Sequence, residues 1–169
     1  PANVKFESVE TAEEMKQACE AYLPSSIAVL SAAVADWRST TSSPDKIKKN
    51  PNDNSGLSLE LTENPDILAY LSRHAHRPDL LIGFAAETNN VVENARDKRA
   101  RKGCDWIVAN DVSPETGVMG GAENTVHIID QANHEAWEKM SKTEVAHRLA
   151  ARIAHHFCPD PNPQQEAVS

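Results

Sequence analysis

The segment LLIGFAA, at residues 80–86, decides the fold. It is an almost unbroken apolar run, and such runs are typical of strands that a parallel sheet buries on both faces. A helical stretch follows at residues 91–102 and ends before Gly103, a residue type favoured just beyond helix C-termini. The apolar run WIVA, at residues 106–109, predicts the next strand. Strand, helix and strand in this order predict a right-handed crossover between parallel strands.

The chain before this crossover supplies another helix and another strand. A capping box formed by Thr11 and Glu14 opens a predicted helix at residues 12–23. Residues 27–35 are then almost continuously apolar, which predicts a second buried strand that ends at Asp36. The alternation of helices and strands predicts an α/β fold, a Rossmann-like three-layer domain with a mainly parallel sheet.

A polar segment separates these two parts. Residues 39–56 have no apolar periodicity and exceed an ordinary connection in length, which predicts a flexible flap. Residues 57–62 alternate with period two, which predicts a strand with one exposed face, apart from the main sheet. Asn64 then predicts the cap of a short helix whose first residue is Pro65.

The C-terminal part predicts one more strand and one more helix. Residues 125–130 read as the strand, and a capping box of Ser141 and Glu144 opens the last helix. The proline-rich stretch after residue 158 ends this helix, so we expect one domain at residues 1–158 and a disordered tail at residues 159–169.

Composition excludes several classes of protein. The chain has 169 residues and a formal net charge of -8, which disfavours binding to nucleic acid. Its three cysteines lie far apart and form neither a disulfide framework nor a CxxC zinc motif. No apolar run approaches the roughly 20 residues that span a bilayer. We therefore expect a cytoplasmic protein without membrane or nucleic-acid partners.

Positive charge nevertheless gathers locally. The sequence KIKK at residues 46–49 lies in the predicted flap, and Lys98 and Lys102 share one face of the predicted helix at residues 91–102. Such groups can be solvated surface residues or can neutralise a polyphosphate. The predicted buried strands end in the polar residues Asp36, Glu87 and Asn110, where open parallel sheets bind ligands, although polar residues also favour turns for local reasons.

Common catalytic and metal motifs are missing. The sequence contains no GxSxG, GxxxxGK[ST] or GxGxxG, which disfavours a hydrolase elbow, a P-loop and a dinucleotide fingerprint. Its seven histidines show neither HExxH nor zinc-finger spacing, so no metal ligand is predicted.

Six short motifs occur in one order: AAVADWR, KIKK, NPDIL, GFAAET, KGCDWIVAND and GGAEN. With these motifs, over about residues 9–130, the chain resembles phosphopantothenoylcysteine synthetase, most closely the bacterial CTP-dependent type. Those enzymes are usually the C-terminal half of a bifunctional protein whose other half is a flavin-dependent decarboxylase. The resemblance implies ligation of 4'-phosphopantothenate with L-cysteine, in which CTP and Mg²⁺ form an acyl-cytidylate that cysteine attacks. FMN would belong only to the decarboxylase half.

The resemblance also implies roles for residues of this chain. Leu30, Ser31 and Ala32 would border the cytosine, Asp36 the ribose region, and Pro65, Asp66, Ile67, Leu68 and Phe84 the rest of the nucleotide pocket. Lys46, Lys98 and Lys102 would face the phosphates, with Lys46 as the catalytic lysine.

Nothing before Val4 supplies the family's first strand, glycine-rich turn and substrate-binding asparagine. We therefore expect this chain alone to be inactive. The main alternative is a nucleotide-binding or dimerisation fragment, in which the strands at residues 57–62 and 125–129 form an arm that pairs two subunits into a homodimer. A Rossmann oxidoreductase is disfavoured because a dinucleotide loop is missing.

Overall fold

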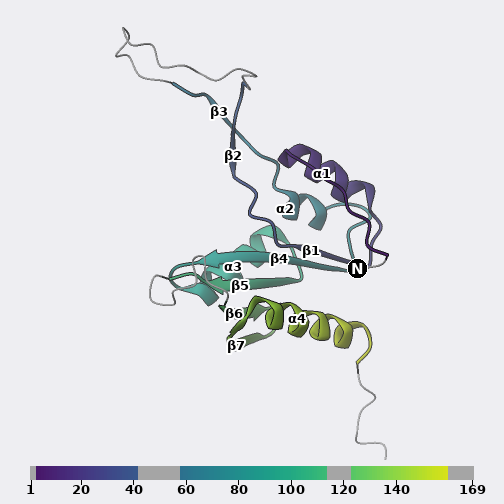
Figure 1. Ribbon diagram of the computed structural model, residues 1–169, viewed down its shortest axis with the longest axis vertical. Coiled ribbons are helices and arrows are strands. Elements are labelled where there is room, and N and C mark those ends of the chain that lie inside the picture. Colours follow the sequence, from purple (N-terminus) through teal and green to yellow (C-terminus); the bar gives the residue numbers. More distant parts are fainter. Residues whose placement is uncertain (1–2, 42–57, 114–122, 160–169) are drawn as a thin grey trace, which may run out of the picture. The chain divides into compact units, whose positions relative to one another are not determined.

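The computed structural model describes residues 3–41, 58–113 and 123–159, which are coloured in Figure 1. These residues form two compact units. The first contains the described residues up to Gly83 together with Arg101–Asp105, and the second contains Phe84–Ala100 and the described residues from Trp106 onward. The strands form a five-stranded mixed sheet in the order β1-β4-β5-β6-β7 and a separate two-stranded sheet of β2 and β3. The predicted α/β, Rossmann-like class is confirmed.

The first unit combines two helices with a parallel strand pair and the two-stranded ribbon. Its elements are α1 (Ala12–Ala21), β1 (Ile27–Leu30), β2 (Trp37–Ser39), β3 (Leu61–Glu63), α2 (Ile67–Ser72) and the first half of β4 (Leu80–Glu87). Strand β1 runs parallel to β4, with Ile27 opposite Leu80 and Leu30 opposite Gly83. The predicted capping box of Thr11 and Glu14 opens α1.

Strand β1 differs from its prediction. It contains four residues rather than nine, and residues 31–36 form no strand. Ile27 and Val29, which share one face of the strand, are 39% and 43% exposed, so the described residues leave this face partly uncovered. The strand is short because it lies at the edge of the sheet, where β4 is its one neighbour, and the pairing with β4 ends at Leu30 opposite Gly83.

The second unit is built on antiparallel strands. Its further elements are α3 (Val91–Lys102, of which the last two residues belong to the first unit), β5 (Trp106–Asp111), β6 (Glu123–Ile129), β7 (His134–Ser141) and α4 (Lys142–Phe157). Strand β6 pairs antiparallel with both β5 and β7. The strand predicted at residues 125–129 therefore lies in the main sheet between β5 and β7, and its part in a dimerisation arm stays a prediction.

The two-stranded ribbon contains the other part of that predicted arm. Trp37 pairs with Glu63, and Ser39 pairs with Leu61. The strand predicted at residues 57–62 is observed only as β3, and residue 57 lies outside the described residues, as does most of the flap predicted at residues 39–56.

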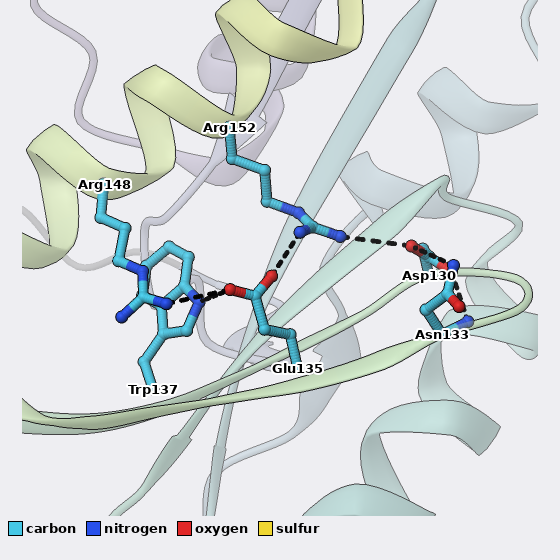
Figure 2. Close-up of polar contacts among 6 residues, drawn as sticks. All are labelled: Asp130, Asn133, Glu135, Trp137, Arg148 and Arg152. Carbon is cyan, nitrogen blue, oxygen red and sulfur yellow. Dashed lines mark hydrogen bonds and ion pairs between the residues drawn. The ribbon is translucent and has the colours of Figure 1, made fainter. Parts of the chain in front are cut away.

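Helix α4 is fixed to β6 and β7 by charged and aromatic contacts (Figure 2). Arg152 forms ion pairs with Glu135 and Asp130, and Arg148 lies 3.1 Å from the carboxylate of Glu135. The indole Nε1 of Trp137 donates to the same carboxylate at 2.7 Å. The apolar side of this contact consists of the buried residues Val126, Ile128, Trp137, Val145 and Leu149. Among the described residues, no helix is long and apolar enough to cross a membrane.

Candidate functional site

Exposed residues follow the carboxyl end of β1, where the sequence predicts the cytosine contacts. Leu30 is the last residue of this strand, and Ser31 and Ala32 lie in the exposed irregular segment after it. Asp36 is also exposed and directly precedes β2. Ligands of open α/β sheets bind beyond the carboxyl ends of strands. The shortened β1 therefore leaves all four predicted contacts within reach of a ligand.

Hydrogen bonds join the segment around Asp36 to the segment before α2. The backbone N–H of Asn64 donates to the carbonyl of Asp36 at 2.8 Å, and its side-chain Nδ2 donates to the carbonyl of Ala35 at 2.8 Å. The guanidinium of Arg38 donates to the carbonyl of Glu63 at 2.7 Å and to Asn64 Oδ1 at 3.0 Å. Two predicted parts of the nucleotide pocket are therefore neighbours in the first unit.

The N-terminus of α2 corrects one prediction. The cap is Asp66 rather than Asn64, because the Asn64 side chain is already bonded to Ala35 and Arg38. The Asp66 carboxylate instead accepts from the backbone N–H of Ala69 at 3.1 Å. The predicted contacts Ile67 and Leu68 form the buried first turn behind this cap, and Pro65 precedes it.

The ion pair between Asp66 and Lys102 links the cap of α2 to the last residue of α3. Burial raises the pKa of Asp66, but the hydrogen bonds from Lys102 and Ala69 and the charges of Lys102 and Arg101 outweigh burial, so the pKa lies below its usual value. The carboxylate is therefore ionised at neutral pH and holds the Lys102 ammonium in place. The structure thus brings together two predicted site residues that are 36 positions apart in the sequence.

Glycine at position 103 allows α3 to end at this point. Its φ angle is +71°, a conformation that other residues rarely adopt, and a Cβ here would lie 3.1 Å from the Ser72 hydroxyl of α2. The predicted C-cap is confirmed, and the close approach of Gly103 to Ser72 positions Lys102 beside the cap of α2.

Polar groups of the second unit gather where β4 and β5 end. The backbone N–H of Val112 donates to the Glu87 carbonyl at 2.9 Å, and Asn94 Nδ2 donates to the Asn89 carbonyl at 2.9 Å and to the Glu87 carboxylate at 3.3 Å. Asn110 Oδ1 is buried and accepts no hydrogen bond from residues 3–41, 58–113 or 123–159. A buried acceptor without a donor is rare and costly, and a missing ligand or water is a common reason.

Asn110 is the functional candidate that the sequence analysis left out of the nucleotide contacts. Its place at a predicted strand end was the only sequence signal, and many asparagines occupy such positions for local reasons. The buried Oδ1 atom, which lacks a hydrogen-bond donor among the described residues, is a structural signal of a ligand contact that the sequence could not supply.

The remaining predicted site residues fall elsewhere. Phe84 is half-buried in β4, and Lys98 is half-buried on α3, both in the second unit. Lys46, the predicted catalytic lysine, lies outside the described residues. Within residues 3–41, 58–113 and 123–159, no three histidine, cysteine, aspartate or glutamate side chains are grouped to hold a metal ion.

A Rossmann-like α/β domain with polar groups at its strand ends is the class that these features define. The family model described as "DNA/pantothenate metabolism flavoprotein C-terminal domain" matches residues 1–157, so the chain belongs to this family. The resemblance found in the sequence is thereby confirmed.

Relatives and solved structures agree with this assignment. The chain is 44% identical over 133 residues to the coenzyme A biosynthesis bifunctional protein CoaBC of Escherichia coli K12, covering 78% of this chain and 32% of that protein. It is 38% identical over 159 residues to CoaBC of Haemophilus influenzae, covering 93% and 38% of the two chains. The chain therefore spans about a third of the length of these relatives.

The crystal structure of the C-terminal domain of CoaBC superposes with a TM-score of 0.71 at 28% identity, covering 95% of this chain and 71% of that one. A flavoprotein from Streptococcus pneumoniae has a TM-score of 0.68 at 18% identity, covering 92% and 73% of the two chains, which shows the fold alone.

Proposed function

We propose that this chain is the synthetase part of a cytoplasmic coenzyme A biosynthesis protein. It would join 4'-phosphopantothenate to L-cysteine through an acyl-cytidylate made from CTP, giving 4'-phosphopantothenoylcysteine, CMP and pyrophosphate. Membership of the flavoprotein C-terminal family and similarity to CoaBC support the pathway. We assign any FMN to the decarboxylase part of such a protein rather than to these residues.

The ion pair between Asp66 and Lys102 is the observation that carries the nucleotide role. Asp66 is ionised, and its carboxylate is fixed as the N-cap of α2. It therefore holds the Lys102 ammonium in one place before any nucleotide arrives. Lys102 is about one-fifth exposed and can exchange its carboxylate partner for a phosphate oxygen. A cation that is already positioned stabilises developing negative charge without reorganisation.

The chemistry needs positioning and charge neutralisation more than covalent catalysis by the protein. We assign Lys102 and Lys98 to the phosphates of CTP, and Lys46 to the charge that develops on the leaving pyrophosphate. Leu30, Ser31, Ala32 and Asp36 would hold the nucleoside at the end of β1, and Pro65, Asp66, Ile67, Leu68 and Phe84 would complete the pocket.

Mg²⁺ fits this arrangement as an ion that arrives with the nucleotide. Mg²⁺ usually keeps several waters and binds through substrate phosphates and one or two carboxylates. The described residues offer single carboxylates such as Asp36, and they contain no larger cluster of ligands. When bound, the ion would neutralise phosphate charge.

Pyrophosphate release tests the proposal directly. The chain, alone and joined to the N-terminal part that its longer relatives contain, is incubated with phosphopantothenate, cysteine and each of the four nucleoside triphosphates. We expect release that depends on both acceptors and is fastest with CTP in the joined protein. Pyrophosphate release from CTP at the same rate with and without phosphopantothenate and cysteine would contradict ligation.

A second candidate is a dimerisation fragment that binds CTP without turning it over. The ribbon of β2 and β3 supports this role, because Trp37 and Leu61 are each 55% exposed on it. Sedimentation of the wild-type chain and of Leu61→Glu would test it. A wild-type dimer that becomes monomeric in Leu61→Glu supports the role, and equal masses for both proteins contradict it.

A further inference from the structure

Two histidines of the second unit meet across β6 and β7. His127 Nδ1 and His134 Nε2 are 2.9 Å apart, and the two rings are nearly parallel, with 25° between their planes and 5.1 Å between their centroids. The strand register explains the contact. His134 lies opposite Ile129, two residues along β6 from His127, so both imidazoles project from the same face of the sheet.

The other histidines are arranged differently. His74 Nδ1 accepts from the backbone N–H of His76 at 3.1 Å, and these two rings are tilted by 51°. The rings of His156 and Trp106 are nearly perpendicular, with 5.3 Å between their centroids. All seven histidines lie in the described part of the chain, and His127 and His134 face each other through their ring nitrogens.

The distance between the two nitrogens matches a particular coordination geometry. Metal–imidazole bonds are about 2.0–2.1 Å long, so two ligands at 90° are about 2.8–3.0 Å apart, whereas two tetrahedral ligands are about 3.3–3.4 Å apart. The observed separation of 2.9 Å falls in the first range. Octahedral and square-planar ions such as Ni²⁺ and Cu²⁺ have such angles, and imidazole is a preferred ligand of both.

We propose that His127 and His134 form a two-imidazole chelate for a divalent transition-metal ion with 90° ligand angles, with water in the remaining positions. In the metal-free pair, one of the facing nitrogens carries the shared proton. On binding, this proton moves to the other nitrogen of the same ring, so a neutral pair releases no net proton. A pair that carries one extra proton releases it.

The surroundings favour a cation at neutral pH. Burial lowers the pKa of His127, and the charge of a protonated His134 lowers it further, while the charge of Asp111 on β5 acts in the opposite direction. The negative charge of Asp111, which acts on His127, also attracts a cation to the pair. His134 is exposed, so an ion reaches the pair from solvent.

Titration of the untagged chain with Ni²⁺ at pH 7.5 tests the chelate. We expect one strong site per chain in the wild-type protein and affinity at least ten-fold weaker in His134→Ala. The control is His147→Ala, an exposed histidine on α4, which keeps wild-type affinity. His127→Gln would lose the site as well, and its circular dichroism spectrum would show whether it folds.

A second readout separates the chelate from scattered binding. Paramagnetic Ni²⁺ at a small fraction of the protein concentration broadens the ring proton signals of His127 and His134 before those of the other five histidines. The melting temperature of the wild-type protein, but not of His134→Ala, rises with added Ni²⁺. Equal Ni²⁺ affinity in the wild type and His134→Ala, or equal broadening of all histidines, would overturn the proposal. Neither result bears on the CTP reaction.

Discussion

Two charged clusters of this molecule differ in how many partners hold each cation. In the second unit, Arg152 bonds to both Glu135 and Asp130 and stacks on the Trp106 ring, with its guanidinium carbon 5.0 Å from the ring centroid. In the first unit, Lys102 pairs with the carboxylate of Asp66, its one ion-pair partner among residues 3–41, 58–113 and 123–159. A cation with several fixed partners stabilises the fold. A cation with one partner can change that partner for a ligand at a smaller cost to the fold, and this difference is what the predictions below test for Arg152 and Lys102.

Removal of the multiply bonded cation should have the largest effect on stability. Arg152→Ala leaves Glu135 and Asp130 without their shared partner and removes the stem that covers Trp106. Because the side chain is 27% exposed, we expect a loss of about 2–3 kcal/mol in the free energy of unfolding, below the range for fully buried pairs. Urea denaturation measures it. Arg96→Ala, at an exposed position on α3, is the control and should change stability by less than about 0.5 kcal/mol. Equal losses in both variants would refute the structural role of Arg152.

Removal of the singly bonded cation should instead affect the reaction. Lys102→Gln loses one partly exposed ion pair, which costs about 0.5–1 kcal/mol of stability. If Lys102 faces the phosphates, CTP-dependent turnover of the joined protein should fall about ten-fold, equivalent to about 1.4 kcal/mol. Lys139→Gln breaks the exposed pair with Glu123 and serves as the matched control, with full turnover. Normal turnover in Lys102→Gln would remove this residue from the site.

Local signals in the sequence predicted the helices well. Both capping boxes are present, at Thr11 and Ser141, and α3 has the predicted bounds because Gly103 ends it. Strand β7 was not predicted. Its position 135 faces α4, where an apolar residue would reveal the strand, but Glu135 occupies it and is neutralised by two arginines of α4. A buried-face position occupied by a charged residue breaks the alternation of apolar and polar residues that would predict a strand, and its arginine partners cannot be recognised from the sequence alone.

The candidate site was predicted through motifs rather than through geometry. The motif residues Asp66 and Lys102 do meet, but no spacing rule could place α2 beside the end of α3. Asp66, rather than the predicted Asn64, caps α2 because of contacts with a distant segment. The Asn64 side chain is already hydrogen-bonded to Ala35 and Arg38. Tertiary hydrogen bonds decided both points.

Asn110 offers a smaller test of the same distinction between structural and ligand-binding groups. Its Oδ1 has no hydrogen-bond donor in the part of the chain that the structure describes, so Asn110→Ala should change the free energy of unfolding by less than about 1 kcal/mol. Asn94→Ala is the comparison, because Asn94 Nδ2 bonds to the Asn89 carbonyl and the Glu87 carboxylate, and it should cost about 1 kcal/mol or more. We expect Asn110→Ala to weaken the CTP-dependent rise in melting temperature. An unchanged rise would mean that a water, not the nucleotide, fills the place beside Oδ1.

The smallest expected effect is on the stability of the fold at acid pH, which depends on one carboxylate in each cluster, Asp66 and Asp130. The pKa values of Asp66 and Asp130 are both below the usual 3.8, because hydrogen bonds and nearby cations outweigh the opposing effect of burial. The unfolded chain therefore binds protons first as the pH falls, so each carboxylate stabilises the fold above pH 3.8 and loses this contribution below it. Asp66→Asn and Asp130→Asn keep an oxygen that accepts the backbone hydrogen bonds but remove the charge. Both should flatten the decrease in stability between about pH 4.5 and pH 2.5, measured by urea denaturation.

If the comparison of the clusters is right, added CTP at neutral pH should stabilise Asp130→Asn as much as the wild type, whereas Asp66→Asn should respond differently because its Lys102 is no longer held. Identical responses to CTP in the two variants would show that Asp66 does not position Lys102 for the nucleotide.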